Sequence, residues 1–256
     1  MASATYSTQV IVLKKTKLGE CDLIESLLAA DGSQLRVVAK GARKPGNPFA
    51  SRLELYSCAE VLCSKGRNLD IVKEARLIDG NEKLRIEIEY STGAAPMAEL
   101  LDKITQNDLE DKRLFAMTRV AFSALCRVDS ENIPSITAAH LLKTLAFAGL
   151  RPSFTHCAVC GLPIKETGFG ELASISYREG GLLCPRCEPT HDSLKLDAGT
   201  IAWAHYLLGS SFDQISEKKV ASQDVFAVLH FCQAWIREHL GIQLKSLRFL
   251  LTSGIF

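Results

Sequence analysis

Apolar and polar residues alternate with a period of two over much of the first 80 residues of the chain. In residues 33–40, Leu35, Val37 and Ala39 occupy every second position. Successive side chains of a β-strand point to opposite faces, so this spacing is typical of strands with one buried face. We predict five strands, at residues 8–14, 22–30, 33–40, 53–64 and 68–78.

Short turns separate these strands. Asp31-Gly32 lies between the second and third strands, and both residue types tolerate the positive φ angles of a tight hairpin turn. Five short strands joined in this way suit a small Greek-key barrel of the OB type. A fragment of a β-sandwich is the alternative that the pattern leaves open.

After Asp79 the period of the apolar residues becomes helical. We predict helices at residues 95–106, 109–127 and 135–149, with Asp108 as an N-cap and Gly149 as a C-terminal stop. Arg151-Pro152 marks a boundary, and the helical period returns at about 197–208 and 223–240. Residues 242–256 form a short, basic and apolar tail.

The predicted fold is therefore α+β. An OB-fold β-barrel domain occupies residues 1–80, and an α-helical domain follows in two parts, 81–151 and 191–256. Residues 152–190, rich in Gly, Cys and Pro, form an inserted cysteine module between the two parts.

Charge is unevenly distributed along a chain whose formal net charge is only +1. Residues 1–76 hold 12 basic and 8 acidic residues, a net charge of +4, whereas residues 77–256 are net negative. A nucleic-acid surface must therefore arise from local segregation of charge. No stretch is long and apolar enough to span a bilayer, and no signal peptide is visible, which predicts a cytosolic location.

The densest positive stretch, residues 32–53, contains no acidic residue. Its centre is a basic loop, residues 40–46, whose glycines let backbone amides approach phosphate groups. The candidate DNA-binding residues are Lys14, Lys15, Arg36, Lys40, Arg43, Lys44 and Arg52. Few aromatic residues interleave with them, so we expect phosphate contacts and little sequence preference. An ordinary solvated loop is the alternative.

Four of the nine cysteines form two C-x-x-C knuckles, Cys157/Cys160 and Cys184/Cys187. A two-residue spacer lets one turn aim both sulfurs at a single ion, so the set predicts a tetrahedral Zn²⁺ site with one ion per chain. Four cysteines leave no open coordination position, which makes the site structural. We expect His156 and His191 to be non-ligands. Two redox dithiols are the alternative, although no βα unit carries the motifs.

No signature of an enzyme is present. The chain lacks a P-loop, a G-x-S-x-G elbow and an H-E-x-x-H zinc motif. A nucleic-acid deaminase needs H-x-E and a proline before its cysteine pair, but Leu183 precedes Cys184 here and no H-x-E occurs. We expect a non-catalytic protein.

Over nearly its whole length the sequence resembles the RecO family of bacterial recombination mediators. Four segments carry the resemblance: Val12-Leu13 with Leu18-Gly-Glu20 and Asp22; Val38-Ala-Lys40-Gly-Ala-Arg43-Lys44 with Leu53-Glu54-Leu55; Phe154 and the two knuckles with Gly180-Gly181; and Leu244-Lys245-Ser246-Leu247-Arg248. The family usually has a basic residue or serine after the loop proline, where this chain has Gly46-Asn47.

The resemblance implies a role in DNA repair at the bacterial nucleoid. It implies binding of single- and double-stranded DNA, annealing of complementary strands, partnership with RecR, and loading of RecA on DNA coated by single-strand-binding protein. It further implies capture of the acidic, apolar C-terminal tail of single-strand-binding protein. The predicted helices at 109–127 and 135–149 offer candidate cations for that tail, namely Arg119, Arg127, His140 and Lys143, alternating with Phe122, Leu141, Leu145 and Phe147.

Other interpretations remain open at this point. A zinc-ribbon transcription factor or RNA-binding factor would carry the same cysteine pattern. A purely structural interaction module would as well. Plain helix packing with solvated cations is the alternative to the tail site.

Overall fold

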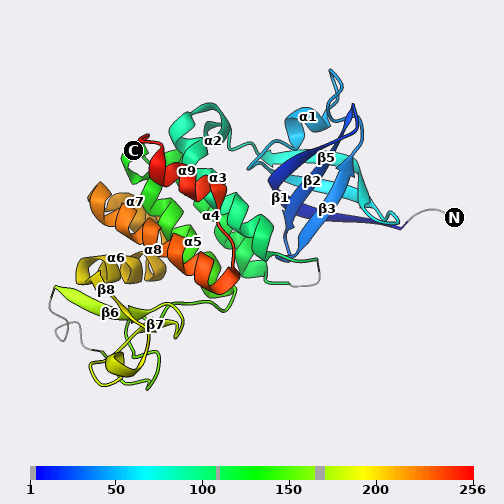
Figure 1. The fold of residues 1–256 in the computed structure, drawn as a ribbon. Helices are drawn as coiled ribbons and strands as arrows, with labels where there is room; N and C mark the ends of the chain where they lie inside the picture. Colours follow the sequence, from blue (N-terminus) through cyan, green and yellow to red (C-terminus); the bar gives the residue numbers. More distant parts are fainter. Residues whose placement is uncertain (1–3, 108–109, 165–170) are drawn as a thin grey trace. The chain divides into compact units, whose positions relative to one another are not determined.

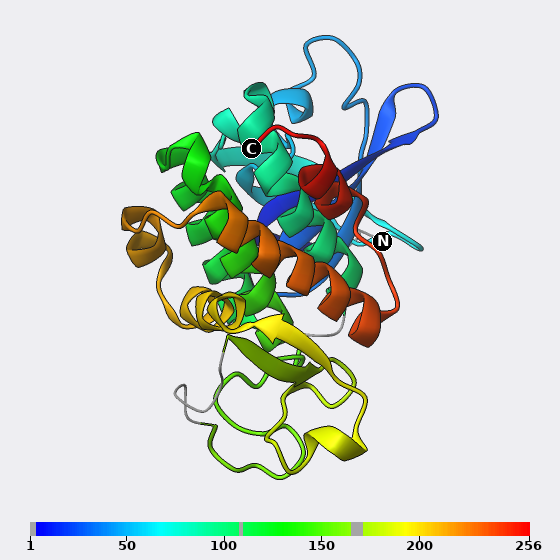
Figure 2. The same cartoon turned by 60° about the vertical axis from the view of Figure 1, so that its left-hand side comes forward.

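The computed structural model describes residues 4–107, 110–164 and 171–256 of the chain (Figures 1 and 2). The chain divides into two compact units, Met1–Arg127 and Val128–Phe256. The first unit holds the five predicted strands together with the helices that follow them. The compact units thus divide within the stretch predicted as the first part of the helical domain.

Five strands form a closed barrel in the first unit, in the order β1-β2-β3-β5-β4 with β4 pairing back to β1 (Figure 1). The β3–β5 pairing is parallel, and the other pairings are antiparallel. The predicted OB-type barrel is confirmed, and the sandwich alternative is wrong. The elements are β1 (Thr5–Leu18), β2 (Asp22–Ala29), β3 (Gln34–Ala39), the short helix α1 (Phe49–Arg52), β4 (Cys58–Ser64) and β5 (Asp70–Asp79).

Side chains at alternate positions along the strands point inward and form the core of the barrel. Val10, Val12, Leu27, Val37 and Val61 are fully buried in its core. Where the pairing of β1 with β2 shifts between Val12 and Lys14, a bulge bends the long first strand. β4 starts later than predicted, because residues 53–57 form a turn in which Tyr56 takes a positive φ of 66°.

The predicted hairpin at Asp31-Gly32 joins β2 to β3. Oδ1 of Asp31 accepts a hydrogen bond from the amide of Ser33 at 2.9 Å. Gly32 has a φ of +91°, and the backbone of Asp111 occupies the space that a Cβ atom would take there. Only glycine satisfies both conditions.

After the barrel, the described part of the first unit continues with the helices α2 (Lys83–Ile86), α3 (Ile88–Ile104) and α4 (Lys112–Arg127). Phe122 of α4 is fully buried and meets the ring of Tyr56 edge-on, with centroids 5.5 Å apart. The predicted N-cap Asp108 and the predicted first residue Leu109 lie outside the described residues.

Among its described residues, the second unit contains five helices: α5 (Ile133–Phe147), which a 3₁₀ turn (Ser130–Asn132) precedes, α6 (Ala198–Gly209), α7 (Phe212–Glu217), α8 (Ser222–Leu240) and α9 (Lys245–Thr252). Trp235 of α8 is buried, and its indole N–H donates to the carbonyl oxygen of Leu150 at 2.9 Å. α5 ends as predicted just before Gly149, whose φ is +78°. α7 and α9 are additions to the predicted helices.

A small antiparallel sheet carries the cysteine module. Its order is β7-β6-β8, with β6 (Leu172–Ser176), β7 (Gly181–Leu182) and β8 (Leu194–Asp197), and a 3₁₀ turn spans Glu188–Thr190. β6 and β7 lie between the two cysteine pairs in sequence. Figure 2 shows this sheet and its loops at one end of the helices of the second unit.

Candidate metal centre and nucleic-acid interface

Each cysteine knuckle is a tight turn closed by backbone hydrogen bonds. In the first, the amide of Gly161 donates to the carbonyl oxygen of Cys157 at 2.9 Å, and Gly161 takes a φ of +71°. In the second, the amide of Cys187 donates to the carbonyl oxygen of Cys184 at 3.0 Å. These turns place both sulfurs of a knuckle on the same side of the chain.

The two knuckles bring four sulfurs together. The Sγ atoms of Cys157, Cys160, Cys184 and Cys187 all lie within 4.8 Å of one another. Sγ of Cys160 is 3.7 Å from Sγ of Cys184. Four thiolates at about 2.3 Å from a tetrahedral ion would be about 3.8 Å apart, so the cluster has the dimensions of a Cys₄ metal site. The four cysteines can therefore bind a metal ion.

The protein environment shifts the pKa values of two of these thiols in opposite directions. Burial opposes ionisation of Cys157, but backbone amides of Cys160 and Cys184 point at its sulfur and lower its pKa to about 6. Burial and the three neighbouring sulfurs raise the pKa of Cys187 to about 12. Four adjacent thiolates repel one another, and a bound dication is the natural way to hold all four ionised.

Two histidines flank the cluster without belonging to it. Nδ1 of His191 lies 2.9 Å from the carbonyl oxygen of Cys187, and Nδ1 of His156 lies 2.9 Å from the hydroxyl oxygen of Thr155. Neither is among the four residues whose ligand atoms converge. The four cysteines that converge are those of the two knuckles.

The basic loop is held at its first glycine by an acidic residue of β2. The amide of Gly41 donates to Oδ1 of Asp22 at 2.7 Å, and the amide of Lys44 donates to the carbonyl oxygen of Gly41 at 2.8 Å. Gly41 and Gly46 have φ angles of +67° and +76°. The loop is thus a turn of defined shape that leaves its cationic side chains exposed.

The structure divides the seven candidate DNA-binding residues into two groups. The side chains of Arg36, Lys40 and Lys44 are exposed and make no hydrogen bond or ion pair with any described residue. Those of Lys14, Lys15, Arg43 and Arg52 are partnered. The first group has its full charge available for phosphate.

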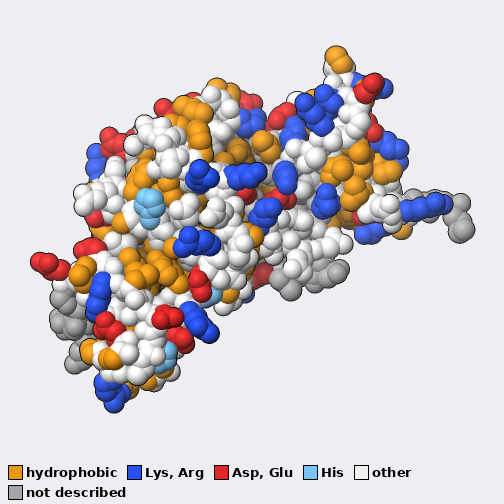
Figure 3. All heavy atoms as spheres, in the orientation of Figure 1, with side chains coloured by type: hydrophobic (Ala, Val, Ile, Leu, Met, Phe, Trp, Pro, Cys, Tyr) orange, Lys and Arg blue, Asp and Glu red, His pale blue; other side chains and the backbone are white. Residues whose placement is uncertain are grey.

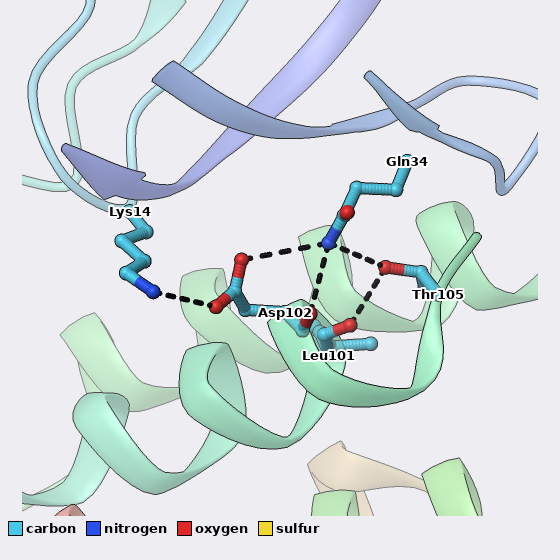
Figure 4. Close-up of polar contacts among 5 residues, drawn as sticks. All are labelled: Lys14, Gln34, Leu101, Asp102 and Thr105. Atoms are coloured by element: carbon cyan, nitrogen blue, oxygen red, sulfur yellow. Dashed lines mark hydrogen bonds and ion pairs between the residues drawn. The ribbon is translucent and has the colours of Figure 1, made fainter. Parts of the chain in front are cut away.

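Lys14 of β1 forms an ion pair with α3, where that helix packs against the barrel (Figure 4). Its ammonium lies 3.2 Å from Oδ2 of Asp102, which an amide from β3 also contacts: Nε2 of Gln34 donates to the carbonyl oxygen of Asp102 at 2.9 Å. Thr105 caps the same helix end by donating to the carbonyl oxygen of Leu101 at 2.6 Å. Lys14 is thereby engaged in holding α3 against the barrel.

The barrel surface has a hollow of about 710 Å³ that the sequence did not indicate. Phe49, Arg52 and Lys73 contribute to its lining, as do Glu60 and Glu74. Arg76 pairs with Glu60 at 2.7 Å, so this hollow is less positive than the basic loop. Phe49 and Lys73 come from distant segments, and only barrel closure brings them together.

Comparison with known proteins decides the family. The family profile described as "Recombination protein O N terminal" matches residues 1–81, and "Recombination protein O C terminal" matches residues 85–248. The chain belongs to the RecO family. Its relatives include proteins named DNA repair protein RecO from Desulforamulus reducens (29% identity; 96% of this chain and 93% of the relative), Roseiflexus sp. (30%; 98% and 86%) and Nocardioides sp. (30%; 96% and 98%).

The predicted partner-binding residues of this RecO-family chain differ in their exposure and in their hydrogen bonds. Arg119 and Arg127 are exposed on α4. Val120, 49% exposed, follows Arg119 directly on the same helix. Lys143 of α5 donates instead to the carbonyl oxygens of Leu208 and Ser210, at 2.7 and 2.8 Å.

The prediction for His140 is wrong, because its side chain is 0% exposed within α5. Burial, assisted by the charge of Lys143, lowers its pKa to about 3, so the ring is neutral and internal. Phe122, Leu141 and Leu145 are core residues as well. The helical period that suggested a binding stripe there reflects packing. Among the described residues, no helix has the length and apolarity needed to cross a membrane.

Proposed function

We propose that the chain is a non-catalytic recombination mediator in DNA repair, acting in the bacterial cytoplasm at the nucleoid. In this proposal it binds single- and double-stranded DNA, anneals complementary strands, and acts with RecR to help RecA load on DNA coated by single-strand-binding protein. Membership of the RecO family supports this over a zinc-ribbon transcription factor or RNA-binding factor.

One observation carries the proposal: an exposed, acid-free basic loop with a defined backbone projects from a closed OB-type barrel. Arg36, Lys40 and Lys44 release counterions when they meet phosphates, and this favours binding without sequence preference. Annealing needs such binding, because either strand must be held by its backbone while its bases stay free to pair.

We assign zinc to the four cysteines as a structural ion. Thiolate ligands suit zinc, and a closed four-sulfur shell leaves no position for substrate. When bound, the ion supplies crosslinking of the two knuckles. The chain's own contribution is the pair of turns and the amides that point at Cys157 and Cys184.

We place the tail of single-strand-binding protein on α4. Arg119, Val120 and Arg127 supply cations and an apolar contact on one exposed helix, which fits an acidic peptide with an apolar end.

A strand-annealing assay tests the function. Two complementary oligonucleotides, one carrying a donor dye and one an acceptor, are mixed without ATP, first naked and then coated with single-strand-binding protein. We expect the full chain to accelerate annealing in both cases. Annealing at the spontaneous rate in both would refute the proposal, and binding of RNA in strong preference to DNA would favour the transcription or RNA-binding alternative.

A further inference from the structure

A hollow of about 350 Å³ lies between α8 and α9 in the second unit. His230, Gln233 and Arg237 line it from α8, Arg248 from α9, and Gln243 from the connection between them. We call it the α8–α9 groove. The sequence did not indicate this groove, because residues 242–256 were predicted only as a basic, apolar tail.

The polar side chains of the groove are nearly all hydrogen-bond donors. None of the described residues that line it is acidic. Glu238, the neighbour of Arg237 in sequence, lines a different hollow with Tyr177 and Asp192. No Asp or Glu occurs at all in residues 242–256. Figure 3 shows Lys and Arg side chains and a histidine over α8 and α9.

Three of these side chains have no partner within the described part of the chain. The side chains of Arg237 and Arg248 are exposed and make no ion pair or hydrogen bond there, and the same holds for His230. Two other exposed cations of this unit are engaged: Lys195 pairs with Glu188 at 2.6 Å, and Lys218 lies over the rings of Trp203 and Tyr206. The groove therefore concentrates unmatched positive charge, which is the chemistry of an oxyanion site.

The arrangement favours a polyanion over a single carboxylate. His230 and Arg237 are seven residues apart on one face of α8, about 10 Å along the helix, a spacing that suits more than one anionic group. Phe249, next to Arg248 on α9, is a large aromatic side chain left 51% exposed. Cations spread along a groove match the phosphates of a nucleic-acid strand, and an exposed ring on the same helix as Arg248 offers a surface on which a base can stack.

We propose that the α8–α9 groove is a second nucleic-acid site, which binds backbone phosphates of a single strand through Arg237, Arg248 and His230. This inference rests on the proposed function and deepens it. A protein that anneals strands benefits from two separate phosphate contacts, because one can hold each strand. The groove is built entirely from the second unit, whereas the basic loop belongs to the first.

Two variants test the assignment by salt dependence. Arg237→Gln/Arg248→Gln removes two groove cations, and Arg178→Gln/Lys219→Gln removes two exposed cations of the same unit outside the groove. Binding of a dye-labelled single-stranded oligonucleotide is measured by anisotropy as a function of salt concentration. We expect the groove variant to lose about 1.4 units of the slope of log affinity against log salt, and the control variant to keep the slope of the parent chain.

His230 provides a local readout in the same full-length chain. Side-chain NMR signals of ¹⁵N-labelled histidine are followed during addition of the oligonucleotide, and His230→Gln identifies the signal. We expect that signal to shift in the parent chain, because a phosphate oxygen that accepts a hydrogen bond from the ring changes the environment of its nitrogens. In the groove variant the shift should be strongly reduced.

The outcomes separate the two proposals. Oligonucleotide binding with an unmoved His230 signal, and equal slopes for the two variants, would overturn the groove and leave the proposed function standing. Absence of oligonucleotide binding by the parent chain would overturn both. A shift of His230 caused by an acidic peptide and not by the oligonucleotide would overturn the nucleic-acid assignment and make the groove a protein-docking site.

Discussion

The guanidinium of Arg43 donates a hydrogen bond to the carbonyl oxygen of Glu20 at 2.8 Å, and thereby ties the basic loop to the turn between β1 and β2. A second bond from the same nitrogen reaches the carbonyl oxygen of Gly19 at 3.2 Å. Arg43 therefore stabilises the conformation of the loop in addition to contributing positive charge. Lys40 and Lys44 have no such contact, and this difference makes them the cleaner test of DNA binding.

Replacement of Lys40 and Lys44 by glutamine should weaken binding of all single-stranded sequences about equally. If each ammonium neutralises one phosphate, the salt slope should fall by about 1.4 units. The thermal midpoint should be unchanged, because neither side chain contacts the fold. Lys103→Gln/Lys112→Gln, which removes two exposed charges from the helices of the same unit, is the control and should leave the slope alone. Equal slopes for both variants would place the DNA path elsewhere.

Replacement of Cys160 by serine should lower zinc content and stability together. The change leaves three thiolates, and metal binding energy is folding energy for such a module, so the loss should be on the order of several kcal/mol. Zinc per chain and thermal unfolding with and without a chelator measure it. Cys126→Ser, outside the cluster, should retain one zinc. A parent chain prepared with zinc but free of it would exclude the metal site.

Glu25 should make the barrel less stable as pH rises. Its carboxylate is 0% exposed on β2, opposite Lys15 of β1, and neither oxygen has a hydrogen-bond partner among the described residues. Burial raises its pKa from 4.5 to about 7; the charge of Lys15, which pairs with Glu54 at 3.1 Å, opposes this, and that of Glu54 adds to it. The folded chain therefore keeps a proton between these two pH values that the unfolded chain releases.

The sign follows from that extra proton. The stability associated with Glu25 is fully present below pH 4.5 and is lost as pH rises to about 7 and beyond. Glu25→Gln keeps the shape and removes the charge, so above pH 7 it should be more stable than the parent by up to about 3 kcal/mol. Thermal midpoints between pH 5 and pH 8.5 test this, with the exposed Glu74→Gln as control. Parallel curves for parent and Glu25→Gln would contradict it.

Replacement of Arg127 by alanine should weaken binding of a peptide that ends in the acidic tail of single-strand-binding protein. Loss of one charge-assisted contact should cost about 1.5–3 kcal/mol, roughly a tenfold or greater loss of affinity. Binding of naked DNA through the basic loop should not change. Titration of a labelled tail peptide checks this, and Lys112→Ala, which removes another exposed cation of α4, should leave tail binding intact. Equal affinities of the Arg127 variant and the parent would remove Arg127 from the site.

Local sequence patterns were sufficient for the barrel strands, for most of the length of the main helices and for the cysteine cluster. The first predicted helix, 95–106, is the exception, because α3 begins seven residues earlier, at Ile88. A two-residue alternation such as Leu35, Val37 and Ala39 reports which face is buried without knowledge of the partner strand. A C-x-x-C spacing sets the geometry of one knuckle within four residues. The acid-free run that contains Lys40 and Lys44 likewise depends only on neighbours in sequence. The short helices α7 and α9 were missed because six to eight residues contain too few turns to display a period.

Tertiary structure alone decided what depends on distant neighbours. His140 reads as a candidate cation in sequence, but the helices around α5 bury it and keep it neutral. In the sequence, Lys14 and Arg43 are as good candidates for DNA binding as Lys44. In the structure, Lys14 pairs with Asp102 and Arg43 donates to the carbonyl oxygen of Glu20. The α8–α9 groove exists only because the chain folds back after Leu240. Burial and ion pairing depend on contacts between segments that are far apart in the chain. The sequence therefore shows which residues carry charge, but not which of those charges remain exposed and unpaired.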